Sequence, residues 1–337
     1  TVVILTLSYF LVPTTYNKNI IETKIKNQIS KKYKIDIQMN EKIRYGLLPR
    51  PHFVTKNLSI LRKKKEIGLV KNFKVYIGID NFFSKNKFDI KDLVFTKTDF
   101  NVNKEDLLFF EKLLKTEPND NKIILKKSNI FFKSIDDELL FLNKINYSKF
   151  YYDSYNLENV LISKNEIFNV PYKIIVKNDK FNKKVSSKFN SKKIRLNIES
   201  NTSYEDVIKK GLVDILFINK NMSLNYEIKK NSLNFNTKDK KRLLGLIDFK
   251  PFYLEANVNY EGISFKDLFK RDSILIDLIK SEIFNNQNLN TNLNINIKDI
   301  TNFKELNNLY LKIGLEQGNI IFSDSKVMWK DDLSIFL

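Results

Sequence analysis

The sequence contains no cysteine and only one histidine. The absence of cysteine excludes disulfide bonds, thiolate zinc sites and cysteine nucleophiles together. The single histidine, His52, lies between two prolines in the segment LPRPHF, where we expect a turn or the first residue of a strand rather than a catalytic base. A Ser-His-Asp site would also need a serine on an exposed turn, and the motif G-x-S-x-G does not occur.

Glycine is scarce as well, with 8 residues in a chain of 337. Neither a P-loop nor a G-x-G-x-x-G motif is present, so nucleotide binding through a glycine-rich loop has no support. Acidic pairs such as Asp136–Asp137 and Asp331–Asp332 are adjacent in sequence, and adjacent residues of a strand point to opposite faces. The calcium-loop spacing is also absent. We therefore predict no enzymatic activity, no cofactor and no metal site.

Positive charge is abundant, because 58 Lys and Arg residues against 39 Asp and Glu residues give a net charge of +19. Such an excess is typical of proteins that bind nucleic acid or an anionic membrane surface. The densest clusters are LRKKKE at residues 61–66 and KDKKRLL at residues 238–244. Acids are interspersed elsewhere, and aromatics such as Phe131 and Phe132 fall in apolar patterns rather than beside the basic runs. Nucleic-acid binding, or a general structural or interaction role, is therefore the alternative hypothesis.

The N-terminal segment TVVILTLSYFLV, residues 1–12, carries no charge and is followed by Pro13. Because a membrane-spanning helix needs about 20 apolar residues, we expect residues 1–13 to be part of a signal anchor or transmembrane helix. No cleavage pattern of small residues follows, which favours retention of the anchor over removal. A buried core strand is the alternative. The predicted anchor residues are Val2, Val3, Ile4, Leu5, Leu7, Phe10 and Leu11.

A basic amphipathic helix is predicted at residues 14–34, because Ile21, Ile25 and Ile29 recur every four residues among lysines. It would lie along a membrane surface or cover the first sheet. Most of the chain after it alternates with a period of two, which is typical of strands. Helices are expected to interrupt the strands near residues 103–115, 203–211 and 264–284, each preceded by a capping residue.

The segment LNTNLNINI, residues 289–297, shows the alternation most strictly, with apolar residues on one face and asparagines on the other. Residues 222–228 and 252–260 follow the same rule. Strands with one apolar face are typical of antiparallel sheets that have one solvated face. The sequence therefore predicts a mainly β fold with a few helices, built on an elongated, curved antiparallel-type sheet with two β-regions at residues 35–200 and 201–337.

Two parts of the chain carry a resemblance to a known family. The first comprises the apolar start, the basic helix and the segment YGLLPRPHFVTKNLSIL with the strands after it. The second comprises RLLGLIDFKPFYLEANVNYEGISFKDLF and NLNTNLNINIKDI. In both, the pattern resembles the AsmA family of envelope proteins, and its fixed points here are Gly46, Pro49, Pro251 and Gly262. These motifs are hydrophobic patterns rather than chemically specific sites, although they extend over most of the chain.

The AsmA resemblance implies a single-pass protein of the bacterial inner membrane whose periplasmic body is a β-sheet coiled into an apolar groove. It implies phospholipid as the cargo, a contribution to lipid transport or outer-membrane assembly, contacts with other envelope proteins, and no catalytic residues. We expect the groove to be lined by Leu224, Tyr226, Ile228, Leu254, Ala256, Val258, Leu293, Ile295 and Ile297. The alternative is that LNTNLNINI packs on the helix of residues 264–284 as ordinary protein core.

Overall fold

A computed structural model divides the chain by its internal contacts into two compact units. Unit 1 comprises Thr1–Ile167 and Lys173–Lys180, and unit 2 comprises Phe168–Tyr172 and Phe181–Leu337. The structure describes residues 10–62, 65–78, 89–103, 106, 114, 116–117, 121–133, 137–204, 209–217, 220–229, 232–237, 242–249, 252–264, 266, 283–285, 287, 289–301, 303–330 and 332–336. The predicted boundary between residues 200 and 201 falls inside a strand of unit 2.

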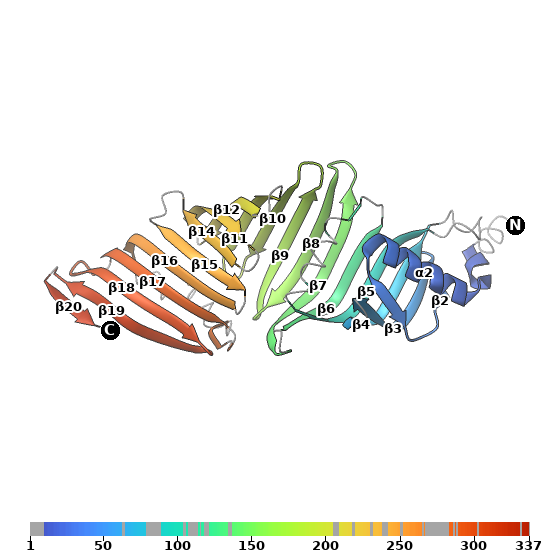
Figure 1. Cartoon of the computed structure of the whole chain (residues 1–337), viewed down its shortest axis with the longest axis horizontal. Helices are drawn as coiled ribbons and strands as arrows, with labels where there is room; N and C mark the ends of the chain where they lie inside the picture. Colours follow the sequence, from blue (N-terminus) through green and yellow to red (C-terminus); the bar gives the residue numbers. More distant parts are fainter. Residues whose placement is uncertain are drawn as a thin grey trace. The chain divides into compact units, whose positions relative to one another are not determined.

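The described part of unit 1 contains a short 3₁₀ helix and a longer α-helix, which are followed by strands (Figure 1). Its elements are η1 (Val12–Thr15), α2 (Lys18–Tyr33), β1 (Asp36–Met39), β2 (Arg44–Gly46), β3 (His52–Arg62), β4 (Lys65–Ile77), β5 (Ile90–Val102), β6 (Lys122–Lys133), β7 (Leu139–Asp153) and β8 (Glu158–Ile167). Strand β9 (Val170–Asp179) is divided between the two units. The prediction of a mainly β chain is confirmed.

The strands of unit 1 pair in sequence order from β3 to β8, and β1 and β2 both pair with the outer edge of β3. All of these pairs except β5–β6 are antiparallel. Between them, β5 and β6 pair in parallel, which requires the chain to cross over the sheet between Val102 and Lys122. The sheet is thus mostly antiparallel, as expected, with one parallel pair that the alternation pattern did not indicate.

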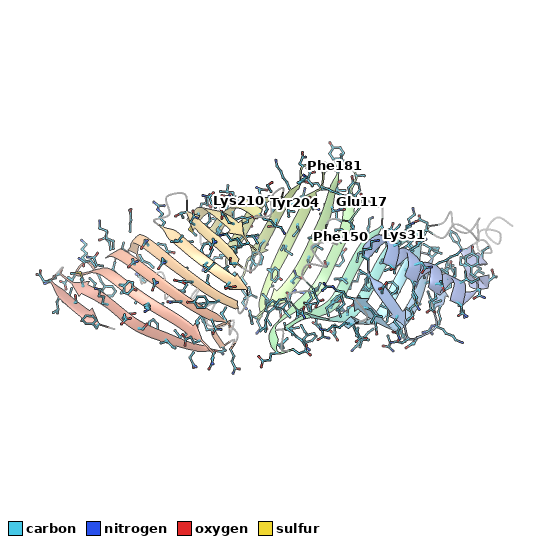
Figure 2. The ribbon with its side chains drawn as sticks, viewed as in Figure 1. Lys31, Glu117, Phe150, Phe181, Tyr204 and Lys210 are labelled. Carbon is cyan, nitrogen blue, oxygen red and sulfur yellow. The ribbon has the colours of Figure 1, made fainter. Side chains whose placement is uncertain are left out.

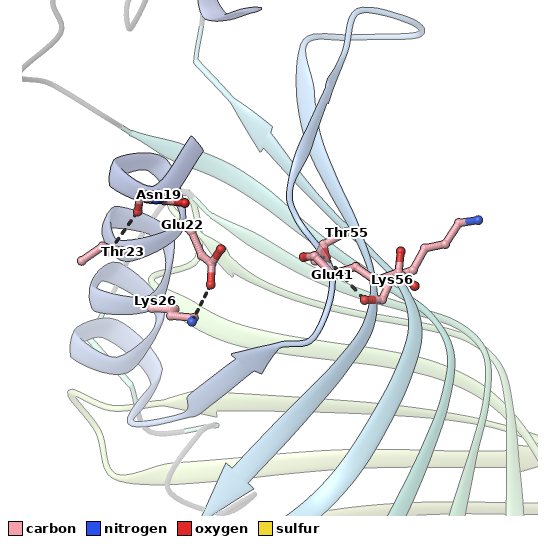
Figure 3. A network of polar contacts seen from close by, with 7 residues as sticks. All are labelled: Asn19, Glu22, Thr23, Lys26, Glu41, Thr55 and Lys56. Carbon is pink, nitrogen blue, oxygen red and sulfur yellow. Dashed lines mark hydrogen bonds and ion pairs between the residues drawn. The ribbon is translucent and has the colours of Figure 1, made fainter. Parts of the chain in front are cut away.

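Helix α2 covers one face of the unit 1 sheet. The Asn17 side chain accepts hydrogen bonds from the Asn19 and Ile20 backbone amides and so caps the first turn. Ile21, Ile25 and Ile29 are buried in one core with the inward residues of β3, β4 and β5. Of the two predicted placements for this helix, the structure shows the second, in which it covers the first sheet. Figure 3 shows α2 beside these strands, with its Glu22–Lys26 ion pair and the contact of Thr55 with Glu41.

The crossover of unit 1 is tied to the sheet at both ends. Asn103 and Asp106 cap each other's backbone amides reciprocally, as predicted for the start of a helix, and Asp106 also pairs with Arg62 on β3. Near its other end, the Leu114 carbonyl accepts hydrogen bonds from the buried amides of Asn159 on β8, at 3.0 Å, and Asn178 on β9, at 2.9 Å. The crossover therefore reaches across the sheet before it returns to β6. The rest of the helix predicted at residues 103–115 lies outside the described residues.

Unit 2 contains the remaining strands. Its elements are β10 (Lys184–Ser191), β11 (Leu196–Ser203), β12 (Lys209–Phe217), β13 (Lys220–Ile228), β14 (Ser232–Thr237), β15 (Leu243–Phe249), β16 (Phe252–Ile263), η3 (Ile283–Asn285), β17 (Asn290–Ile300), β18 (Leu306–Glu316), β19 (Asn319–Trp329) and β20 (Leu333–Phe336). Consecutive strands pair antiparallel except β16 and β17, which pair in parallel. Unit 2 therefore repeats the plan of unit 1, in which one parallel pair follows a crossover.

Two helices were expected in unit 2, and the structure describes the ends of one and little of the other. The helix expected at residues 203–211 is wrong at both ends, since Ser203 ends β11 and Lys209–Gly211 begin β12. There the ladder between β11 and β13 supplies the backbone hydrogen bonds, which outweighs the local capping signal. Most of the helix expected at residues 264–284 lies outside the described residues.

The predicted anchor also lies largely outside the described residues, which include Phe10 and Leu11 but not Val2, Val3, Ile4, Leu5 or Leu7. Within the part of the chain that the structure describes, no helix is long and apolar enough to cross a bilayer.

Candidate lipid-binding face of unit 2

The nine predicted groove residues lie on one face of unit 2. Cross-strand partners share a face of a sheet, and the register joins these residues into rows that run across β13 to β18. The rows are Tyr226–Phe235–Gly245–Ala256–Leu293–Ile313, Ile228–Leu233–Ile247–Leu254–Thr291–Leu315, Leu243–Val258–Ile295–Leu311 and Tyr260–Ile297–Leu309, with Leu224 beside Thr237. We call this surface the apolar face of unit 2.

Burial on the apolar face is uneven. Four of the nine predicted residues, Leu224, Tyr226, Ala256 and Ile297, are buried. The other five are only partly buried, namely Ile228, Leu254, Val258, Leu293 and Ile295. Exposure rises at β19, where Phe322, the register partner of Ile313, is 57% exposed. Apolar side chains of several neighbouring strands thus remain partly accessible in one continuous area.

Two glycines on the apolar face lie beneath aromatic rings. A Cβ atom added to Gly245 would lie 2.2 Å from the Phe235 ring, and one added to Gly211 would meet the ring and hydroxyl of Tyr226. In each case the glycine and the aromatic residue are direct cross-strand partners. The rings therefore lie flat over the neighbouring strand, and the glycines make that possible because they have no side chain.

The opposite face of β16 and β17 carries the asparagines of the LNTNLNINI segment. Asn294 donates to Asn257 and Asn296 donates to Asn259, both at 2.8 Å. These residues are register partners across the parallel pair, so the asparagines form a short hydrogen-bonded ladder on the polar face. The two faces that the alternation predicted are therefore present, one apolar and one lined by amides.

Hydroxyl groups interrupt the apolar face at two points. The Tyr226 hydroxyl hydrogen-bonds with Ser200, at 2.7 Å, and with Thr202 on β11. Thr291, which occupies the row of Leu254, is 5% exposed, and its hydroxyl has no hydrogen-bond partner among the residues that the structure describes. A buried hydroxyl without a partner costs about 1–3 kcal/mol unless another group satisfies it. Sequence reasoning did not single out Thr291, because a threonine fits a strand pattern without signalling its burial.

Cross-strand ion pairs neutralise part of the positive charge. In unit 2, Lys188 pairs with Glu199 at 3.0 Å and Lys210 pairs with Glu227 at 3.3 Å, each with its register partner. Figure 2 shows Lys210 on the ribbon of this unit. At these two positions the charge of a lysine is balanced by an acid on the neighbouring strand. Lys63, Lys64 and residues 238–241 of the two basic clusters lie outside the described residues.

The single histidine of the chain is buried in unit 1. His52 is the first residue of β3, as expected, and it is buried with its ring over Gly46 and its Nδ1 atom 2.8 Å from the Arg50 carbonyl. Burial lowers the pKa of His52, and the positive charge of Lys74 lowers it further, against the opposing effect of the Arg50 carbonyl. Among the described residues, no cluster of His, Asp and Glu could hold a metal ion.

Comparisons with known proteins do not add to this description. No model of a protein family matches the chain, and no curated protein matches it. The resemblance to the AsmA family therefore stays a prediction from the sequence.

Proposed function

We propose that the apolar face of unit 2 binds phospholipid acyl chains. In this proposal the protein is an AsmA-like component of the bacterial cell envelope, anchored in the inner membrane, with its body in the periplasm. There it contributes to lipid transport or outer-membrane assembly. The observation that carries the proposal is the register, which joins partly exposed Leu, Ile, Val and Phe side chains into continuous rows across six strands.

The energetics favour this type of ligand. An acyl chain of sixteen carbons that leaves water gains about 0.8 kcal/mol per CH₂ group, or about 12 kcal/mol in all. Burial of this kind is non-directional and needs apolar area rather than specific donors. The rings of Tyr226 and Phe235, lying over Gly211 and Gly245, add flat area to the floor of the surface. A nucleic acid, the alternative ligand, would need cations rather than this apolar area.

Site-specific photo-crosslinking tests the proposal without disturbing charge. A photoreactive phenylalanine analogue at Ile295, on the apolar face, should crosslink radiolabelled phospholipid, whereas the same analogue at Asn296 should not. These neighbours point to opposite faces of β17, and Asn296 is exposed. Equal labelling at the two positions, or labelling at Asn296 alone, would contradict the proposal.

A paired charge substitution provides the second test. Val258→Asp with Ile295→Asp places two charges on register partners of the apolar face and should abolish phospholipid co-purification. The matched control, Asn201→Asp with Asn225→Asp, adds the same charge to exposed positions of the polar face and should leave lipid binding unchanged. Circular dichroism establishes that both variants fold. Retained lipid in a folded Val258/Ile295 variant would rule out acyl-chain binding at this surface.

A further inference from the structure

The turn between β2 and β3 in unit 1 exposes an apolar tip. Its residues are 47–51, and Leu48 is 81% exposed, more than any other leucine that the structure describes. Pro49 beside it is exposed as well. A single exposed leucine is common on protein surfaces, so this turn is a candidate docking site only together with the apolar and charged residues near it.

A second exposed leucine lies beside this turn. The Tyr45 hydroxyl, on β2, donates a hydrogen bond of 2.7 Å to the Phe10 carbonyl, which holds the segment before η1 against the strand that leads into the turn. Leu11 follows Phe10 and is 50% exposed. Burial, together with the neighbouring Tyr16, raises the pKa of Tyr45 to about 12. Leu11 is thus adjacent to a residue that is hydrogen-bonded to β2, and both tyrosines pack against the core of unit 1.

The charge around the turn is of one sign. Residues 42–65 contain eight Lys and Arg residues and no acid. Lys18, Lys42 and Arg44 are exposed and form no ion pair within the described residues. Two of the eight do form ion pairs. Arg62 pairs with Asp106 at the far end of β3. The Arg50 guanidinium pairs with Asp92 at 2.7 Å and lies 4.4 Å from the centre of the Tyr76 ring, which fixes the base of the turn.

We propose that this surface docks on an anionic phospholipid bilayer. Leu48 and Leu11 would enter the interfacial region, and Lys18, Lys42 and Arg44 would meet the lipid headgroups. Exposed apolar residues and unpaired cations are the combination that an anionic membrane interface accommodates. A nucleic acid would use the cations but not the leucines, and a protein partner of acidic character would not require penetration by Leu48.

This docking surface belongs to unit 1 and concerns the surface of a bilayer, whereas the proposed function concerns single acyl chains on unit 2. Each can fail while the other holds. The chain contains no cysteine, so a single introduced cysteine carries a fluorescent label at one chosen position.

The test uses the full chain with an environment-sensitive nitrobenzoxadiazole label at Leu48→Cys, mixed with vesicles of phosphatidylcholine and phosphatidylglycerol. The label should move to shorter emission wavelength and become accessible to a quencher carried within the acyl region. The matched control is Leu139→Cys, a leucine of unit 1 that is 49% exposed at the start of β7, and its label should remain in water. Vesicles of phosphatidylcholine alone should give weaker binding, because the cations then meet no net negative charge.

Four outcomes would overturn the proposal. The first two concern the label: it remains in water at Leu48 while the protein is bound to vesicles, or it penetrates equally at Leu48 and Leu139. The other two concern binding: the protein binds neutral and anionic vesicles equally, or it binds no vesicles at all. Leu48→Asp supplies a further check, since it should weaken the penetration of a label at Leu11→Cys. Leu48 lies at an exposed turn, so this substitution leaves the core of unit 1 unchanged.

Discussion

Units 1 and 2 are built from the same type of alternating strand, but their apolar faces differ in what covers them. In unit 1, α2 packs on the sheet, and Ile25, Leu58 and Val70 are 0% exposed. In unit 2, side chains in the equivalent alternating positions, such as Leu254 and Ile295, are only partly buried. The alternation of a strand therefore reports that one face is apolar, and not whether protein covers that face.

The two units also share two structural features. Each contains one parallel pair, β5 with β6 or β16 with β17, on either side of a crossover. Each also contains a glycine beneath an aromatic partner, Gly68 under Phe100 in unit 1 and Gly245 under Phe235 in unit 2. The difference in burial therefore arises within a common plan, and in unit 1 the packing of α2 accounts for the closed face.

The largest effect is expected where α2 closes unit 1. Ile25→Asp places a charge at a position with no exposure, and it should destabilise unit 1 by about 4 kcal/mol or unfold it. Hydrogen exchange measured by mass spectrometry should then show lost protection in peptides from β3 to β5. The control on the same helix is Ile20→Asp, where the side chain is 55% exposed and the cost should stay within about 0.5 kcal/mol. Equal costs at the two positions would mean that α2 does not close the face.

A truncation in each unit measures the difference in burial directly. Leu58→Ala in unit 1 should cost about 3 kcal/mol, because it leaves a cavity at a fully buried site. Leu254→Ala in unit 2 should cost about 1 kcal/mol, because its side chain is already partly in water. Urea unfolding followed by circular dichroism gives both values, and the single tryptophan, Trp329, reports unit 2 separately by fluorescence. A cost at Leu254 as large as that at Leu58 would show that the face of unit 2 is as closed as that of unit 1.

The sequence predicted strand faces better than strand pairing. The helix at residues 18–33 and the faces of β13, β16 and β17 follow from spacing alone, because a period of four or of two fixes which residues share a side. The parallel pairs could not be predicted in this way, because the choice of neighbour depends on contacts between residues far apart in sequence. For the same reason the segment before Gly211 was assigned to a helix from its local capping signal, although Gly211 lies in β12.

Residues with positive φ angles set a second limit on sequence reasoning. Asn57, Lys97 and Lys127 adopt φ angles of 51°, 54° and 50° within β3, β5 and β6. In β3, Thr55 is buried and the next buried residue is Leu58, three positions later, so the alternation of buried and exposed residues is interrupted at Asn57. The sequence does not indicate this conformation at Lys97 or Lys127, because lysine is common throughout the chain and φ angles above zero favour glycine or asparagine.

Two glycine substitutions test how closely unit 2 is packed around Gly245 and Gly314. Gly245→Ala would place its Cβ atom 2.2 Å from the Phe235 ring and 2.7 Å from the Glu255 carbonyl oxygen, so it should destabilise unit 2 by about 1–3 kcal/mol. Gly314→Ala is the control, because its Cβ atom would have no neighbour nearer than 3.7 Å, and it should be neutral or slightly stabilising. The unfolding midpoint by Trp329 fluorescence gives the comparison. Equal effects would indicate that the Phe235 ring moves aside freely.

The smallest expected effect is a pH dependence confined to unit 1, which holds the only histidine of the chain. Burial lowers the pKa of His52 in the folded state, so the unfolded chain binds a proton at a higher pH than the folded chain does. The stability of unit 1 should therefore be complete above the unfolded-state pKa of about 6.5 and should fall as the pH is lowered through it. Hydrogen exchange at about pH 7.5 and about pH 5.5, each compared with His52→Phe, measures the change.

The Phe variant keeps an aromatic ring over Gly46 but cannot be protonated, so its β3 peptides should lose less protection on acidification than those of the native chain. A native chain that is equally protected at both pH values would show that the His52 side chain does not stay neutral beneath its strand neighbours. A matching loss in β13 to β18 would place the pH effect on groups other than this histidine.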